Sequence, residues 1–139
     1  MNFVLDNSVA ARWFFDDGNS SDLAYADKVL AAIKRQTAAV PGIWGLEAAN
    51  VLVRAEANGF LSQARTKESL ELINDLDIVV DDETLSRSLS DTLDLARRFK
   101  LTAYDASYLE LALRLDIPLA TLDYKLIKAA RKAGVERFA

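Results

Sequence analysis

The chain has 139 residues, a length typical of one domain, and 51% of its residues are hydrophobic, which is typical of a folded globular chain. It contains no Cys and no His, so disulfides, thiolate and histidine metal sites, Ser-His-Asp triads and histidine general bases are excluded. Seventeen Lys and Arg against 21 Asp and Glu give a net charge of −4, which mildly disfavours nucleic-acid binding and leaves carboxylate chemistry, with or without a hard cation.

Strands and helices alternate in the first half of the chain. Short apolar runs predict buried strands, whereas longer segments with apolar residues three and four apart predict helices. In chain order, the patterns predict a strand at 2–5, a helix beginning just after Ser8, a loop at 16–19, a helix from Ser20, a strand at 38–41 and a helix at 43–58. The Asn58-Gly59 pair is typical of a helix end.

The alternation continues through the second half. In chain order, the patterns predict a helix at 62–75 capped by Ser62, a strand at 77–81, helices at 84–100 and 104–115, a strand at 117–122, a helix at 124–133 and a weak edge strand at 135–138. We therefore expect an α/β fold in one domain covering 1–139, with a mostly parallel sheet of four to five strands and helices on both faces.

Three acidic residues lie near the junctions between these elements, and each has an ordinary structural explanation. Asp6 follows the first strand and Asp123 follows the fourth, so either carboxylate suits a helix N-cap or a turn. Asp105 lies in LTAYDASYLELAL, where Thr102-x-x-Asp105 resembles a capping box. Taken singly, each residue is adequately explained as part of a helix start.

Glu47 is harder to explain as a structural residue. It lies inside the predicted helix of PGIWGLEAANVL, and its neighbours four residues away are Ile43 and Val51. An acidic side chain in an apolar stripe is rarely buried without a partner. The sequence therefore predicts a cationic partner for Glu47.

All four acids reach one edge of the sheet if the first and fourth strands are neighbours. Ligands of open α/β sheets bind beyond the carboxyl ends of the strands, which is where Asp6 and Asp123 lie. Unneutralised carboxylates at this edge would repel one another, and a divalent cation with oxygen ligands removes that repulsion. We therefore predict an Mg²⁺ or Mn²⁺ site formed by Asp6, Glu47, Asp105 and Asp123, with Asp6 and Asp105 as the direct ligands.

Four segments cover almost the whole chain: NFVLDNSVAARWF, VPGIWGLEAANVL, LTAYDASYLELAL and PLATLDYKLIKAARKAGV. In order and spacing they resemble the motifs of PIN-domain ribonucleases, particularly the small VapC-type toxins of toxin–antitoxin pairs. The resemblance implies an α/β/α sandwich, Mg²⁺-dependent RNA cleavage, a homodimer and a neutralising antitoxin protein. It assigns the catalytic acids by position: Asp6, Glu47, Asp105 and Asp123.

The resemblance also covers residues around the acids. Ser8 and Thr121 match the hydroxyl residues of the family's first and last motifs and are expected to support the site. The chain departs from the family pattern at Asn7, where a small or hydroxyl residue is more common, and at Asp116, where Gly or Asn is frequent. Neither departure affects the four acids.

Hydrolysis at such a site would leave a 5′-phosphate and a 3′-hydroxyl, because water attacks in line with the leaving ribose oxygen. These residues do not by themselves distinguish RNA from DNA, so the preference for RNA rests on the resemblance. Lys125 and Lys128 in the last helix are candidate RNA contacts, although an ordinary solvated helix face explains them equally well. A bound cation would offset the net negative charge that a phosphate meets.

Two other functions remain open. A receiver-type phosphoacceptor domain also combines an α/β sheet, Mg²⁺ and clustered acids, but it needs adjacent acids after the first strand, where Asn7 and Ser8 follow Asp6. A catalytically inactive PIN-like module would bind partners without cleavage, and the four acids disfavour it. Because Met1 leads directly into a predicted strand and no apolar run approaches the ~20 residues of a membrane helix, we expect a cytoplasmic protein without a membrane partner.

Overall fold

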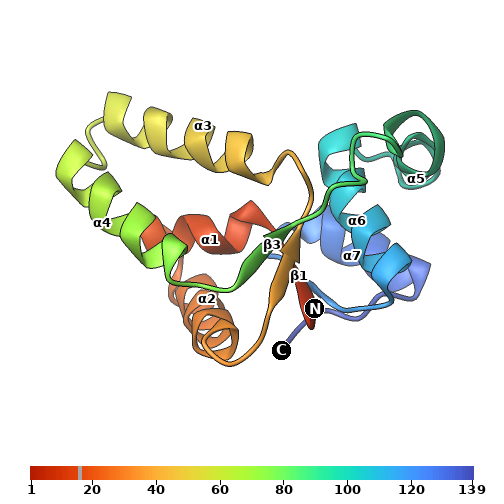
Figure 1. Cartoon of the computed structure of the whole chain (residues 1–139), viewed down its shortest axis with the longest axis horizontal. Helices are drawn as coiled ribbons and strands as arrows, with labels where there is room; N and C mark the ends of the chain where they lie inside the picture. Colours follow the sequence, from red (N-terminus) through yellow and green to blue (C-terminus); the bar gives the residue numbers. More distant parts are fainter. Residues whose placement is uncertain (16) are drawn as a thin grey trace.

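A parallel sheet lies at the centre of the computed structural model, which describes residues 1–15 and 17–139 (Figure 1). Its strand order is β3-β2-β1-β4. In that order the strands are Ile78–Val80, Ala38–Val40, Phe3–Leu5 and Leu119–Ala120. Every pairing is parallel, and all residues of β1, β2 and β4 are buried, as their uninterrupted apolar sequences predict.

Helices cover both sides of this sheet, so the predicted α/β/α architecture is confirmed. In Figure 1 the helices of the first half lie to the left of the strands, and α3 and α4 form a hairpin that extends away from them. These helices are α1 (Asn7–Phe14), α2 (Ser20–Ile33), α3 (Trp44–Ala57) and α4 (Gln63–Asn74). On the other side lie the π-helical turn η1 (Ser88–Thr92) and helices α5 (Leu93–Phe99), α6 (Ala103–Leu115) and α7 (Tyr124–Ala133).

The register of the two central strands positions the candidate site. Strand β1 pairs with β4, as the proposed convergence of acids requires, and Leu5 lies opposite Ala120. The N–H of Asp6 then donates to the carbonyl of Ala120 at 3.0 Å. Asp6 and Thr121 therefore lie side by side, just beyond the carboxyl ends of β1 and β4.

Several predicted helix boundaries are confirmed. The hydroxyl groups of Ser62 and Thr102 each accept a backbone N–H bond at 3.1 Å and cap α4 and α6. Helix α3 ends before Asn58-Gly59, and Gly59 has a φ of +78°, which is readily accessible to glycine. Of the predicted loop at 16–19, residues 17–19 lie outside helices and strands, whereas Asp16 lies outside the described residues.

The prediction of one continuous helix over 84–100 is wrong. Residues 84–87 form turns, the next five form η1, and only Leu93–Phe99 are α-helical. The Thr84 hydroxyl donates to the Asp81 carboxylate at 2.7 Å and accepts the Gly42 N–H at 2.9 Å. These tertiary hydrogen bonds hold Thr84 at the ends of β2 and β3 and explain why no helix begins there.

The predicted weak edge strand at 135–138 is confirmed only as a single parallel bridge between Leu119 and Arg137, with two backbone hydrogen bonds of 3.0 Å between this segment and Leu119. The predicted strand at 117–122 shortens to the two residues of β4. The sheet thus has four strands within the described residues, and its β4 edge is covered by the C-terminal segment, whose Phe138 ring stacks on Phe3 with centroids 4.0 Å apart. In the described part of the chain, no helix combines the length and apolar character needed to cross a membrane.

Candidate active site

Four acidic residues surround the carboxyl edge of the sheet, each at or near the start of a helix. Asp6 and Asp123 immediately precede α1 and α7, whereas Glu47 and Asp105 lie in the first turns of α3 and α6. Because the strands are parallel, their carboxyl ends share one edge. The four acids therefore lie around one edge of the sheet, although in the described part of the chain no three of them bring ligand oxygens within 4.8 Å of one another.

Asp6 is the most buried of these acids, with 7% of its surface exposed. Its Oδ2 atom accepts the hydroxyl protons of Ser8 at 2.7 Å and Thr121 at 2.8 Å. In the part of the chain that the structure describes, the Asp6 side chain makes no capping bond to α1. The helix-cap explanation therefore fails for Asp6, and its carboxylate is held by the two hydroxyl groups instead.

The two hydroxyl residues are themselves held by backbone groups. Ser8 Oγ accepts the N–H of Leu122 at 2.9 Å, and Thr121 Oγ1 accepts the N–H of Asp123 at 3.0 Å. Each hydroxyl is therefore an acceptor toward the β4–α7 connection and a donor toward Asp6. The Asp6 Oδ2 atom is fixed, and both predicted supporting residues contact it.

The negative charges of neighbouring acids raise the pKa values of Asp105 and Asp6. Burial raises the pKa of Asp105, and the negative charges of Asp123 and Glu47 raise it further, whereas the Thr102 hydrogen bond and the charge of Lys125 act in the opposite direction. Charges act appreciably over short separations only. The four acids and Lys125 therefore share one electrostatic environment.

Burial is the main reason that the pKa of Asp6 rises from 3.8 to about 6. The charges of Asp105 and Glu47 raise the pKa further, and the hydrogen bonds from Ser8 and Thr121 lower it. A carboxylate in such a site is costly to ionise without a positive partner.

Asp123 has a structural role as well as a place at the edge. Its Oδ1 atom accepts the N–H of Leu126 at 3.2 Å and caps α7. The capping explanation is therefore confirmed for Asp123. Its carboxylate nevertheless raises the pKa of Asp105, so Asp123 both caps α7 and adds negative charge at the edge of the sheet.

The hydrogen-bond partner of the Glu47 carboxylate is the phenol group of Tyr108. The Tyr108 hydroxyl donates to Glu47 Oε1 at 2.5 Å, and Tyr108 is fully buried. No Lys or Arg of the described residues forms an ion pair with Glu47, so its expected cationic partner stays a prediction. Nothing in the sequence distinguished Tyr108 from the apolar core residues around it, because tyrosine is common in helix cores.

The donor set of this site fits a hard divalent cation. Within residues 1–15 and 17–139, no Lys or Arg forms an ion pair with Asp6, Glu47, Asp105 or Asp123. The site offers oxygen atoms alone, which Mg²⁺ and Mn²⁺ prefer. A bound cation would neutralise charges that the protein leaves uncompensated.

Comparison with known families decides the identity of the fold. A sequence model of the PIN domain matches residues 3–132. The chain belongs to the PIN domain family. PIN domains are generally metal-dependent nucleases that use divalent metals, so the receiver-type alternative does not fit.

A solved structure agrees with this assignment. The PIN domain superposes on the crystal structure of PAE2754 from Pyrobaculum aerophilum with a TM-score of 0.67 and 22% sequence identity, covering 93% of this chain and 79% of the other. At this identity the likeness concerns the fold. No curated protein matches the chain.

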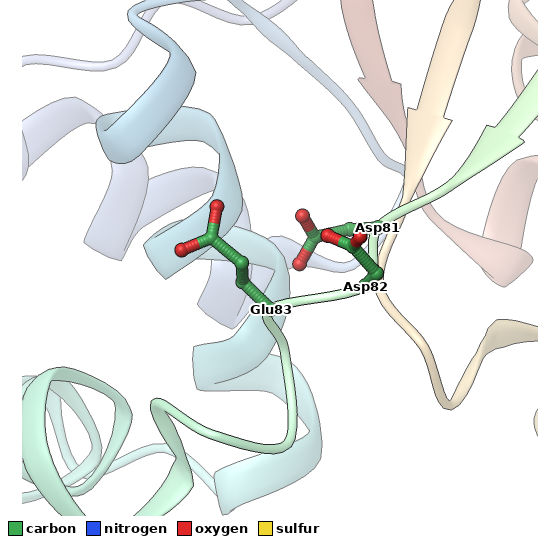
Figure 2. Close-up of side chains that lie close together, drawn as sticks. All are labelled: Asp81, Asp82 and Glu83. Carbon is green, nitrogen blue, oxygen red and sulfur yellow. The ribbon is translucent and has the colours of Figure 1, made fainter.

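Within the described residues, the three acids whose oxygens lie within 4.8 Å of one another are a different set from the four predicted acids. Figure 2 shows its three members, Asp81, Asp82 and Glu83, on the loop that leaves β3. Arg114 of α6 donates to Asp81 at 2.8 Å and lies 3.4 Å from Glu83. Its hydrogen bonds lower the pKa of Asp81. This group already has a cation and joins the β3 loop to α6, so we assign it a structural role.

The raised pKa of Asp6 predicts a specific pH dependence of metal-free stability. Between about pH 4 and pH 6 the folded PIN domain binds the Asp6 proton more tightly than the unfolded chain. The contribution of the protonated Asp6 side chain to the free energy of unfolding is therefore fully present below pH 4 and is lost as the pH rises from 4 through 6. A shift of roughly two units corresponds to about 3 kcal/mol.

Urea unfolding in EDTA from pH 4 to pH 7 checks this prediction through the difference between wild type and Asp6→Asn. Wild type should lose about 3 kcal/mol relative to the variant across this range. Asn retains the acceptor oxygen for Ser8 and Thr121 but has no proton to titrate. A constant difference between the two proteins would show that Asp6 titrates normally.

Proposed function

We propose that this PIN domain is an Mg²⁺- or Mn²⁺-dependent endoribonuclease whose active site consists of Asp6, Glu47, Asp105 and Asp123. The observation that carries the proposal is Asp6, a buried carboxylate without a cationic partner in the described residues, held by two hydroxyl groups and close to the charges of Asp105 and Glu47. The family supplies the metal-dependent nuclease chemistry. The preference for RNA rests on the sequence resemblance.

Each acid has its own part in this proposal. Asp6 and Asp105 would hold the ion directly, and Glu47 and Asp123 would orient waters or a second ion. When bound, Mg²⁺ supplies Lewis-acid polarisation of the phosphoryl group and makes water a better nucleophile. Ser8 and Thr121 both occupy Oδ2 of Asp6, so they fix the direction in which Oδ1 points.

The start of α7 supplies positive charge for the RNA backbone. Lys125 lies close enough to Asp105 to lower its pKa, and Lys128 Nζ lies 5.4 Å from the centroid of the Tyr124 ring. Both lysines are exposed. We assign them to phosphate contacts beside the acids, where they would offset the net negative charge of the chain.

The same proposal extends to biological role. We propose that the chain is a cytoplasmic VapC-type toxin that forms a homodimer and is neutralised by an antitoxin protein. The helical hairpin α3–α4 supports a protein partner, because it exposes large apolar side chains: Leu46, Val53, Phe60 and Leu70 are 45–78% exposed. Such residues are typical of protein interfaces.

Cleavage assays on structured RNA test the enzymatic proposal. Purified protein, free of antitoxin, should cut single-stranded or looped RNA in millimolar Mg²⁺ or Mn²⁺ and leave 5′-phosphates. EDTA should abolish the reaction. Cleavage that continues undiminished in EDTA would contradict a metal mechanism, and RNA binding without cleavage in Mg²⁺ would identify an inactive PIN-like module.

A further inference from the structure

We propose that Tyr108 is a positioning residue that presents Glu47 to the metal site, and that Asn7 holds Tyr108 in turn. This inference rests on the proposed function of the same site. Its basis is a chain of polar contacts that joins α1, which Asp6 precedes, to α3 and α6, which contain Glu47 and Asp105.

The Tyr108 hydroxyl donates its proton to Glu47 in a short hydrogen bond. Tyr108 is 0% exposed and is the largest of the fully buried side chains. Its hydroxyl donates to Glu47 Oε1 at 2.5 Å, across 61 residues of sequence. A buried phenol needs a partner for its proton, and Glu47 provides it.

Asn7 fixes the other side of the phenol oxygen. Asn7 is 8% exposed, and its Nδ2 atom donates to the carbonyl of Trp44 at 3.1 Å and to the Tyr108 oxygen at 3.3 Å. The opposite amide orientation would place two oxygens against each other at Trp44, so the carbonyl selects the observed one. Tyr108 has a single proton, and that proton must therefore go to Glu47.

The direction of this hydrogen-bond chain has a chemical consequence. Because Asn7 donates to Tyr108 and Tyr108 donates to Glu47, the Glu47 Oε1 atom is held as an acceptor, and Oε2 keeps both of its lone pairs for a cation or a water. A glutamate side chain loses substantial rotamer freedom when it is fixed. Here the fold fixes it before any ion arrives, which strengthens binding.

The position of Asn7 couples the acids to one another. Asn7 adjoins Asp6 at the start of α1, Trp44 begins α3, and Tyr108 lies one turn beyond Asp105 in α6. A small or hydroxyl side chain at position 7 would lack the two amide protons with which Asn7 bridges Trp44 and Tyr108. The departure at Asn7 is thus a feature through which this chain supports Glu47.

Manganese titration by calorimetry and RNA cleavage, measured on the same variants, test the inference. Tyr108→Phe removes the hydroxyl but keeps the ring, and it should weaken Mn²⁺ binding by 10- to 100-fold and lower kcat with little change in KM. Asn7→Ala should act in the same direction with a smaller effect. The matched control is Thr66→Val, which deletes a 2.7 Å hydroxyl-to-carboxylate hydrogen bond to Glu56 at the other end of α3 and should leave both quantities within twofold.

A double-mutant cycle separates positioning from general loosening of the core. In the Glu47→Gln background, Tyr108→Phe should cause little further loss of Mn²⁺ affinity, because the group it positions has lost its charge. An undiminished effect in that background, or a Tyr108→Phe protein that behaves like the Thr66→Val control, would overturn the inference, as would a wild-type protein that binds no Mn²⁺. Wild type that binds Mn²⁺ without cutting RNA would overturn only the proposed nuclease function.

Discussion

Asp6→Asn should lower the rate of RNA cleavage by roughly 10²- to 10⁴-fold, which corresponds to about 3–5 kcal/mol of lost transition-state stabilisation. The substitution removes the negative charge that would hold the ion. It keeps the local structure, because Ser8 and Thr121 both donate to one oxygen of Asp6 and the Asn amide oxygen can accept both protons. The effect therefore reports the lost charge.

Cleavage rates at saturating Mg²⁺, measured beside thermal unfolding, check this prediction. The control is Asp27→Asn, an equal change of charge at an exposed position of α2, which should leave cleavage unchanged. Expression of Asp6→Asn should also be tolerated by cells if wild type is toxic. An Asp6→Asn protein that cuts RNA at the wild-type rate would remove Asp6 from the active site.

Arg114→Met should lower the free energy of unfolding by about 3–5 kcal/mol, the cost typical of removing one partner from a buried ion pair. Arg114 donates to both oxygens of Asp81 at 2.8 and 2.9 Å and to both oxygens of Glu110 at 2.8 and 3.0 Å. The Asp81 and Glu110 side chains are only 10% and 3% exposed. Methionine keeps much of the volume but leaves these two carboxylates without their main cation.

Urea denaturation at pH 7 measures this loss, and Arg65→Met is the matched control. Arg65 pairs with Glu68 at 3.7 Å, with both side chains about 70% exposed, so its replacement should change stability by less than about 0.5 kcal/mol. Because Arg114 holds the pKa of Asp81 below its ordinary value, the Arg114 contribution should shrink as the pH falls through the acidic range. A loss below about 1 kcal/mol at pH 7 would show that the β3 loop does not depend on Arg114.

Local sequence determined most of the secondary structure. The runs at 2–5, 38–41 and 77–81 are too short and too apolar for surface helices, and each contains a strand. Helix ends with strong local signals, such as Ser62 and Asn58-Gly59, formed where they were predicted. These features depend on neighbours a few residues away, so a single chain segment contains the information.

Predictions failed where distant residues compete with local preference. The segment 84–100 has helical periodicity, but its Leu85 and Leu89 side chains are 73% and 87% exposed, and Thr84 bonds to Asp81 and Gly42 instead of starting a helix. The segment at 135–138 is apolar enough for a strand, but it meets β4 at a single bridge. At Thr84, tertiary hydrogen bonds outweigh helix propensity.

By itself, the sequence determined the fold class and which carboxylates stand at the ends of elements, because periodicity and chemical exclusion are local properties. Only the tertiary structure decided how those carboxylates are used: Asp6 is held by hydroxyl groups and does not cap its helix, Asp123 does cap one, and Glu47 receives a proton from Tyr108. Burial and hydrogen-bond partners arise between residues as many as 115 positions apart. Local sequence patterns span only a few residues, so they cannot identify partners so far apart in the chain. These residues meet only because the parallel strands bring the starts of the helices to one edge of the sheet.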